Sequence, residues 1–159
     1  WHEQLIKIIF PLGLVSFLLI CYYFLKFYTN ELWALLGLTL MISSNLFLLH
    51  SSISYRDFYM MYYLCLSVIT LLWWFRTQGV GWLYLASFFT GMVTFTKVEG
   101  SAYLIIICFI FTYLPYTTKA LSITKKVNLA IRFSLPALLI CFYFHLYKIF
   151  FSYLKFIGI

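Results

Sequence analysis

The sequence predicts an all-α protein, a polytopic transmembrane helix bundle with about six membrane segments. Three observations support this fold class. The 159 residues are 65% hydrophobic and only 9% charged, whereas about 25% of the residues are charged in a typical soluble domain. The mean hydropathy is +0.99. The apolar residues also gather in long runs, and a helix needs about 20 such residues to cross the hydrocarbon core of a bilayer.

Six apolar runs account for the expected helices, and polar or charged residues separate them. Pro11 interrupts the first run, and Pro136 lies inside the last. The runs cover roughly residues 5–28, 32–49, 58–75, 80–95, 101–116 and 127–147. We interpret residues 1–159 as a single transmembrane domain. The aromatic tail, 148–159, is expected to begin an interfacial helix.

The connections between these runs are short. Successive helices should therefore pack as antiparallel neighbours, and no β-hairpin is expected between Leu32 and Tyr147. Because the chain begins at Trp1 rather than at a methionine, we expect it to be a fragment of a longer membrane protein.

The spacing of charged residues predicts which helix ends share a membrane face. Asp57 and Arg76 are separated by about 28 Å of helix at ~1.5 Å per residue. The intervals from Arg76 to Lys97 and from Lys97 to Lys119 correspond to about 31 and 33 Å. Since the hydrocarbon core is about 30 Å thick, Asp57 and Lys97 should lie at one face, and Arg76 and Lys119 at the other.

The distribution of basic residues predicts the orientation. In the internal loops on the Asp57 side, Arg56 and Lys97 each lie beside an acid. Three further lysines fall on that side and reduce the asymmetry: Lys7, Lys148 and Lys155. On the other side a single acid, Glu31, accompanies six basic residues: Lys26, Arg76, Lys119, Lys125, Lys126 and Arg132. Cytosolic loops carry the excess of Lys and Arg in membrane proteins. The Asp57 and Lys97 face is therefore predicted to be extracytosolic.

The composition argues against two other classes of protein. The net charge of +7 does not indicate nucleic-acid binding, because the basic residues are scattered at segment ends rather than gathered on one soluble face. Each of the four cysteines lies within an apolar run and lacks CxxC or Cys/His spacing. We interpret them as small buried hydrophobic residues, without a disulfide or a metal site: Cys21, Cys65, Cys108 and Cys141.

Lys97 and Glu99 are the first candidate functional residues, because charges at membrane depth are costly and usually have a function. One interpretation is structural: a lysine that extends to the interface and a solvated glutamate, followed by Gly100, which permits a turn. The other is functional: the Lys97 ammonium contacts the phosphate of a lipid carrier, and Glu99 holds the lysine in place. Residue types alone leave both open.

Asp57 is the second candidate, and it follows a polar patch over residues 50–56 that includes Tyr55 and Arg56. As a structural residue, Asp57 would cap the following helix and favour its positive N-terminus. As a functional one, it would bind a metal or orient a sugar hydroxyl. His50 and the serines lack the spacing of a catalytic triad. We interpret His2 and His145 as isolated interfacial or core residues.

Two motifs together resemble a known family. Residues 45–63 read NLFLLHSSISYRDFYMMYY, and residues 85–100 read LASFFTGMVTFTKVEG. They resemble the central membrane region of the integral-membrane glycosyltransferases of the type C superfamily, in the protein-mannosyltransferase-like and aminoarabinose-transferase-like branch. In that family, an Asp after a Ser/Tyr-rich patch is followed by a small-residue helix that ends in Gly-x-x-x-x-Thr-Lys.

The resemblance implies an enzyme that transfers a sugar from a polyprenyl-phosphate carrier to an extracytosolic acceptor. Asp57 and Lys97 match the family's active-site cavity, and Tyr55, Arg56 and Glu99 flank them as further substrate-binding candidates. The family's main acidic motif lies upstream of the matched region, so the catalytic residue is unknown and the fragment alone is expected to be inactive. No cofactor is assigned. Mg²⁺ or Mn²⁺ stays open, because no ligand cluster is evident.

A transporter or flippase segment is the alternative function, with Lys97 and Glu99 paired in a translocation path. A transporter should hold these charges near the midplane between broken helices, and a glycosyltransferase should hold them at the outer interface. The expected partners are the lipid bilayer and the polyprenyl-phosphate-linked sugar. The expected location is the bacterial plasma membrane, with the endoplasmic reticulum membrane as the alternative.

Overall fold

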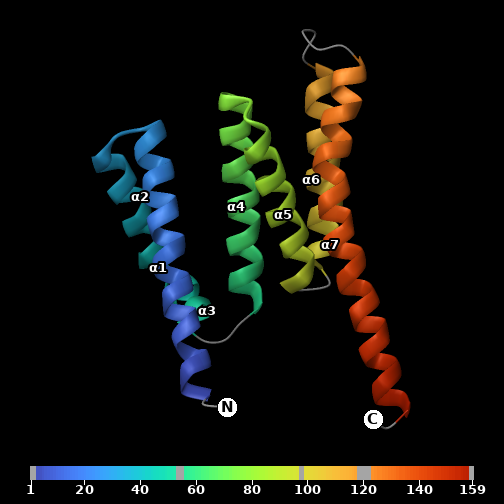
Figure 1. Ribbon diagram of the computed structural model, residues 1–159. Helices are drawn as coiled ribbons and strands as arrows, with labels where there is room; N and C mark the ends of the chain where they lie inside the picture. Colours follow the sequence, from blue (N-terminus) through green and yellow to red (C-terminus); the bar gives the residue numbers. More distant parts are fainter. Residues whose placement is uncertain (1–2, 53–55, 97–98, 118–122, 158–159) are drawn as a thin grey trace. The chain divides into compact units, whose positions relative to one another are not determined.

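The computed structural model describes residues 3–52, 56–96, 99–117 and 123–157 (Figure 1). Every regular element in these ranges is a helix, so the all-α prediction is confirmed and the described residues contain no strand. The seven helices are α1 (Glu3–Tyr28), α2 (Glu31–Ser43), α3 (Asn45–Ser52), α4 (Arg56–Thr77), α5 (Val80–Thr96), α6 (Gly100–Thr117) and α7 (Ile123–Ile157).

Three of these helices are long and apolar enough to span a membrane. Their apolar spans are Ile8–Tyr28, Asp57–Thr77 and Thr124–Leu154. The prediction of about six membrane segments is therefore wrong. α2 has 13 residues and α5 has 17, which at ~1.5 Å per residue gives about 20 and 26 Å, short of the ~30 Å hydrocarbon core. The described apolar part of α6, Gly100–Ile110, is also shorter.

The second predicted segment is interrupted at Ser44, which separates α2 from α3. Ser44 has extended backbone angles, and its N–H donates to the Met41 carbonyl at 3.3 Å. The Ser44 hydroxyl accepts the N–H of Phe47 at 3.4 Å, and its carbonyl accepts the N–H of Leu48 at 3.1 Å. Serine favours such N-cap positions because its oxygen satisfies a free backbone donor. A local cap thus divides a continuous apolar run.

The chain forms two compact units, residues 1–58 and 59–159, and each is described by itself. In the first unit, Asn30 caps α2 by accepting the N–H of Trp33 at 3.0 Å. An exposed ion pair, Lys26 to Glu31 at 3.3 Å, joins the end of α1 to the start of α2. Three phenylalanine rings form the aromatic core of this unit, with centroid distances of 5.9 to 6.2 Å: Phe17, Phe47 and Phe58.

In the second unit, α5 and α7 lie side by side and run in the same direction (Figure 1). Small residues on α5 allow the close approach. The buried Ser87 hydroxyl donates to the Phe133 carbonyl, and a Cβ at Gly91 would lie 2.9 Å from Ile140. Hydroxyl and small side chains at helix interfaces are a common way to pack helices in membranes.

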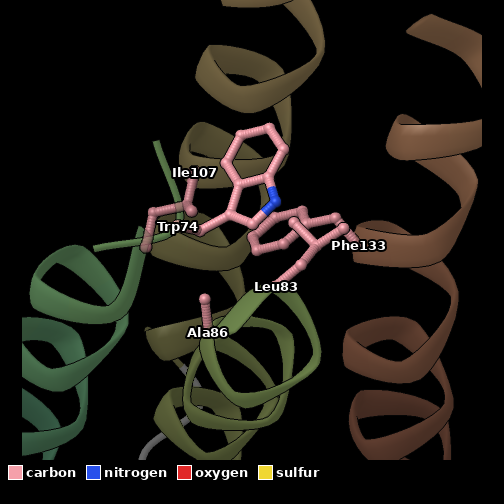
Figure 2. Close-up of a cluster of buried hydrophobic side chains, with 5 residues drawn as sticks. All are labelled: Trp74, Leu83, Ala86, Ile107 and Phe133. Carbon is pink, nitrogen blue, oxygen red and sulfur yellow. The ribbon is translucent and has the colours of Figure 1, made fainter. Parts of the chain in front are cut away.

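A neighbouring face of α5 contacts α4, and a buried cluster joins four helices. The Ser67 and Thr90 hydroxyls bond each other between α4 and α5. Figure 2 shows the cluster, in which the Trp74 indole lies over side chains of the other three helices; its members are Trp74, Leu83, Ala86, Ile107 and Phe133. Because Trp74 and Phe133 share this cluster, the C-terminal end of α4 lies beside the N-terminal half of α7.

The described part of the aromatic tail belongs to the long helix α7. Residues 148–157 continue α7 without a break, so the expectation of a separate interfacial helix is wrong. Pro136 lies inside α7 and Pro11 inside α1. With 35 residues, α7 is about 52 Å long at ~1.5 Å per residue, so it exceeds the thickness of the hydrocarbon core.

Candidate functional site at the turn between α5 and α6

The first candidate residues lie where α5 ends and α6 begins. α5 ends at Thr96, whose hydroxyl donates to the Val93 carbonyl at 2.8 Å. Glu99 precedes α6, and its carbonyl accepts the N–H of Ala102 at 3.1 Å. The Glu99 side chain is exposed. A carboxylate at this position is favoured by the positive N-terminal end of α6, and it remains accessible to a ligand.

Gly100 allows this turn to pack tightly. A Cβ at this position would lie 2.2 Å from the carbonyl oxygen and 2.7 Å from the carbonyl carbon of Val93, and 3.0 Å from the Cα of Thr94. The neighbours are backbone atoms, which cannot rotate away. The sequence indicated a glycine that permits a turn; the structure gives the reason as the close approach of α6 to the last turns of α5.

His145 is a site residue that the sequence did not reveal. Its Nε2 lies 3.3 Å from the Ser101 hydroxyl, although the two residues are 44 positions apart. Both side chains are half-buried. The neighbouring Phe144 packs on Phe95 of α5, with ring centroids 5.1 Å apart. The interpretation of His145 as isolated is therefore wrong, because the pairing of α6 with α7 gives it a polar partner.

The turn and the Arg76 end of α4 lie at opposite ends of the second unit. Trp74 lies at the level of Phe133, whereas Ser101 lies at the level of His145, farther along α7. Figure 1 shows the start of α5 beside the end of α4, and the end of α5 beside the start of α6 at the other end. This arrangement agrees with the predicted separation of Arg76 from the Glu99 end. The predictions for Lys97 and Lys119 fall on residues outside the described ranges.

The second candidate patch belongs to the first unit, and part of it is helical. Tyr55 lies outside the described residues, and Arg56 is the first residue of α4. Asp57 lies in the first turn of α4, where the positive helix end favours a carboxylate, and it is half-buried. The buried Ser51 hydroxyl bonds the Leu48 carbonyl at 2.9 Å, within α3. Asp57 and Glu99 belong to different units, so each stands as a separate candidate.

The potential metal ligands and the cysteines of the described residues are as follows in the structure. Among the described residues, no group of three or more His, Cys, Asp or Glu side chains could hold a metal ion. The four cysteines are free thiols. Cys21 is buried, which confirms its interpretation as a small hydrophobic residue, and the other three are half-buried.

Comparisons of this chain with protein-family models, with curated proteins and with solved structures found no match.

Proposed function

We propose that this chain is part of a membrane glycosyltransferase that moves a sugar from a polyprenyl-phosphate carrier to an extracytosolic acceptor. The observation that carries the proposal is the close approach of Gly100 to the backbone of Val93 and Thr94, which joins the start of α6 to the last turns of α5. It brings an exposed Glu99 to a helix end, next to the Ser101–His145 pair. The carboxylate of Glu99, the hydroxyl of Ser101 and the imidazole of His145 are polar groups near one helix end. Such groups can bind a polar headgroup that enters from the membrane interface.

The chemistry of the transfer explains the residue types. When the sugar leaves, negative charge develops on the carrier phosphate, and a fixed cation stabilises it. Lys97 is the proposed cation, and Glu99 keeps its ammonium in position. His145 is a hydrogen-bond donor to the same phosphate through the ring nitrogen that does not face Ser101.

The sugar and the acceptor need further groups. Asp57, Tyr55 and Arg56 stay separate sugar-binding candidates in the first unit, because carboxylates and guanidinium groups bond hydroxyls in fixed directions. The group that activates the acceptor is not assigned to this chain. Mg²⁺ or Mn²⁺ stays a prediction, for which the described residues offer no ligand cluster.

Two observations favour this proposal over a transporter. Transporters hold substrates between broken helices near the midplane, yet α5, α6 and α7 continue through their described ranges, and Glu99 lies at a helix end. The break at Ser44 adjoins Phe47, whose ring packs on Phe17 and Phe58. An aromatic cluster of this kind offers no oxygen ligands to an ion.

The proposed topology places the α5–α6 turn on the extracytosolic side of the membrane. Arg76, Lys125 and Arg132 then lie on the cytosolic side, in agreement with the excess of basic residues in cytosolic loops. The plasma membrane of a bacterium is the proposed location, with the endoplasmic reticulum membrane as the alternative.

Binding of a polyprenyl monophosphate to the purified chain in detergent tests the proposal. The wild-type chain should bind it, and His145→Ala should weaken binding about three- to tenfold, the usual effect of one hydrogen bond. Tyr143→Ala is the matched control, because Tyr143 is exposed two positions away on α7. Failure of the wild-type chain to bind, or equal weakening by both variants, would contradict the proposal.

A further inference from the structure

A stripe of residues on α7 changes from basic to apolar along one helix face. Its members recur at intervals of three or four residues, which places them on the same side of a helix: Lys125, Asn128, Arg132, Leu135, Leu139 and Phe142. The stripe begins in the first turns of α7 and ends before His145. Its basic half therefore lies at the end of the second unit that is opposite the Glu99 turn, and its apolar half runs toward that turn.

The basic half of the stripe forms a shallow cavity of about 190 Å³, lined by Lys125, Asn128, Leu129 and Arg132. The Nε of Arg132 donates to the Oδ1 of Asn128 at 3.0 Å. This bond uses one of the five N–H donors of the guanidinium and leaves four for a ligand. None of the four acidic residues of the chain lines the cavity, so its charge is positive. A phosphate is the complementary group.

The apolar half forms a second groove of about 370 Å³ on the same helix. Ser134 is its one polar residue, and the side chains of Leu135, Leu139 and Phe142 are 52 to 62% exposed. From Arg132 to Phe142 the helix rises about 15 Å, which is half of the ~30 Å hydrocarbon core and thus the depth of one lipid leaflet.

We propose that this stripe binds one anionic diacyl phospholipid of the cytosolic leaflet. Its phosphate lies in the basic cavity at Lys125, Asn128 and Arg132, and an acyl chain lies along Leu135, Leu139 and Phe142. The two cavities share no lining residue, but Arg132 of the basic cavity and Leu135 of the apolar groove lie three positions apart on α7. This succession favours a lipid over a free phosphate, because an inorganic ion would use only the basic half. Charge complementarity favours an anionic headgroup over a zwitterionic one. The site is independent of the proposed transferase site.

Lipid retention measures this binding directly. The purified chain is incorporated into nanodiscs that contain equal parts of phosphatidylglycerol and phosphatidylcholine, extracted with mild detergent, and analysed by native mass spectrometry. The wild-type chain should retain phosphatidylglycerol preferentially. Lys125→Gln with Arg132→Gln should reduce this preference about 25-fold, or about fivefold for each positive charge near an anionic lipid surface.

The matched control removes two positive charges elsewhere: Lys26→Gln on α1 with Lys148→Gln near the far end of α7. The preference of this control variant for phosphatidylglycerol should equal that of the wild type. Excess glycerol phosphate should not displace phosphatidylglycerol from the wild-type chain. Circular dichroism checks that each variant keeps its helix content. The proposal would be overturned if the wild type retained the two lipids equally, or if the control variant lost its preference for phosphatidylglycerol to the same extent. Displacement of the bound lipid by glycerol phosphate would overturn it as well.

Discussion

Replacing Gly100 with alanine is expected to destabilise the fold by about 3 kcal/mol, the upper end of the usual cost of overpacking. The added Cβ would lie 2.2 Å from the Val93 carbonyl oxygen and 3.0 Å from the Cα of Thr94. Because these are backbone atoms of α5, the contact can be relieved only if α6 moves away from α5. Such a movement would also separate Ser101 from His145.

The matched control is Gly81→Ala, in the first turn of α5, where a Cβ meets no atom within 4 Å. This change should be neutral or should stabilise the helix by up to about 1 kcal/mol, because alanine loses less backbone entropy than glycine. The measurement is unfolding of both variants in detergent, followed by circular dichroism. Similar stability of the two would show that the close packing at Gly100 is not required.

Lys97→Met is expected to reduce sugar transfer by the full-length protein on the order of 10²-fold, as the loss of one electrostatic contact to a developing charge does. Methionine keeps much of the side-chain volume and removes only the charge. Lys97→Arg should lower activity partly, because a planar guanidinium replaces a compact ammonium. Glu99→Gln should cost less than Lys97→Met if Glu99 only positions the lysine.

Lys26→Met is the control for the same chemical change in the other unit of the chain. Lys26 pairs with Glu31 on the surface, where the two side chains are 43% and 66% exposed, and such solvent-screened pairs contribute little to stability. The turnover of the Lys26→Met variant should therefore match that of the wild type. The assay is sugar transfer from a polyprenyl-phosphate donor by variants matched for folded amount. If the Lys97→Met variant turned over at the wild-type rate, the phosphate-binding role of Lys97 would be contradicted. The structural interpretation of Lys97 as an interfacial lysine would then hold.

Helix ends were predictable where apolar runs meet polar residues. The run 58–75 became α4, Arg56–Thr77, and the run 80–95 became α5, Val80–Thr96. The break at Ser44 was not predicted, because a single capping hydroxyl competes locally with a continuous apolar pattern. The predicted number of membrane spans was wrong for a related reason. An apolar run predicts a helix, but the length of that helix decides whether it can cross the bilayer.

The candidate site was predictable only in part. The turn at Glu99 and Gly100 followed from charge and glycine placement, but the close approach of Gly100 to Val93 depends on how α6 packs on α5. The Ser101–His145 contact joins residues 44 positions apart. Hydrophobic periodicity defines the buried face of each helix, but it does not define the register between helices that are distant in sequence. The roles of Asp57 and Lys97 stay predictions.

Photo-crosslinking with a polyprenyl phosphate that carries a photoreactive group next to the phosphate tests the central claim most directly. The probe is bound to the purified chain in nanodiscs and irradiated, and the labelled peptides are identified by mass spectrometry. We predict that the label falls on the α5–α6 turn around Glu99 and on α7 around His145, and that excess unlabelled polyprenyl phosphate prevents it. The account would be contradicted if the label were confined to the Lys125–Arg132 part of α7 or to α2 and α3. It would also be contradicted if the label were spread evenly over all helices.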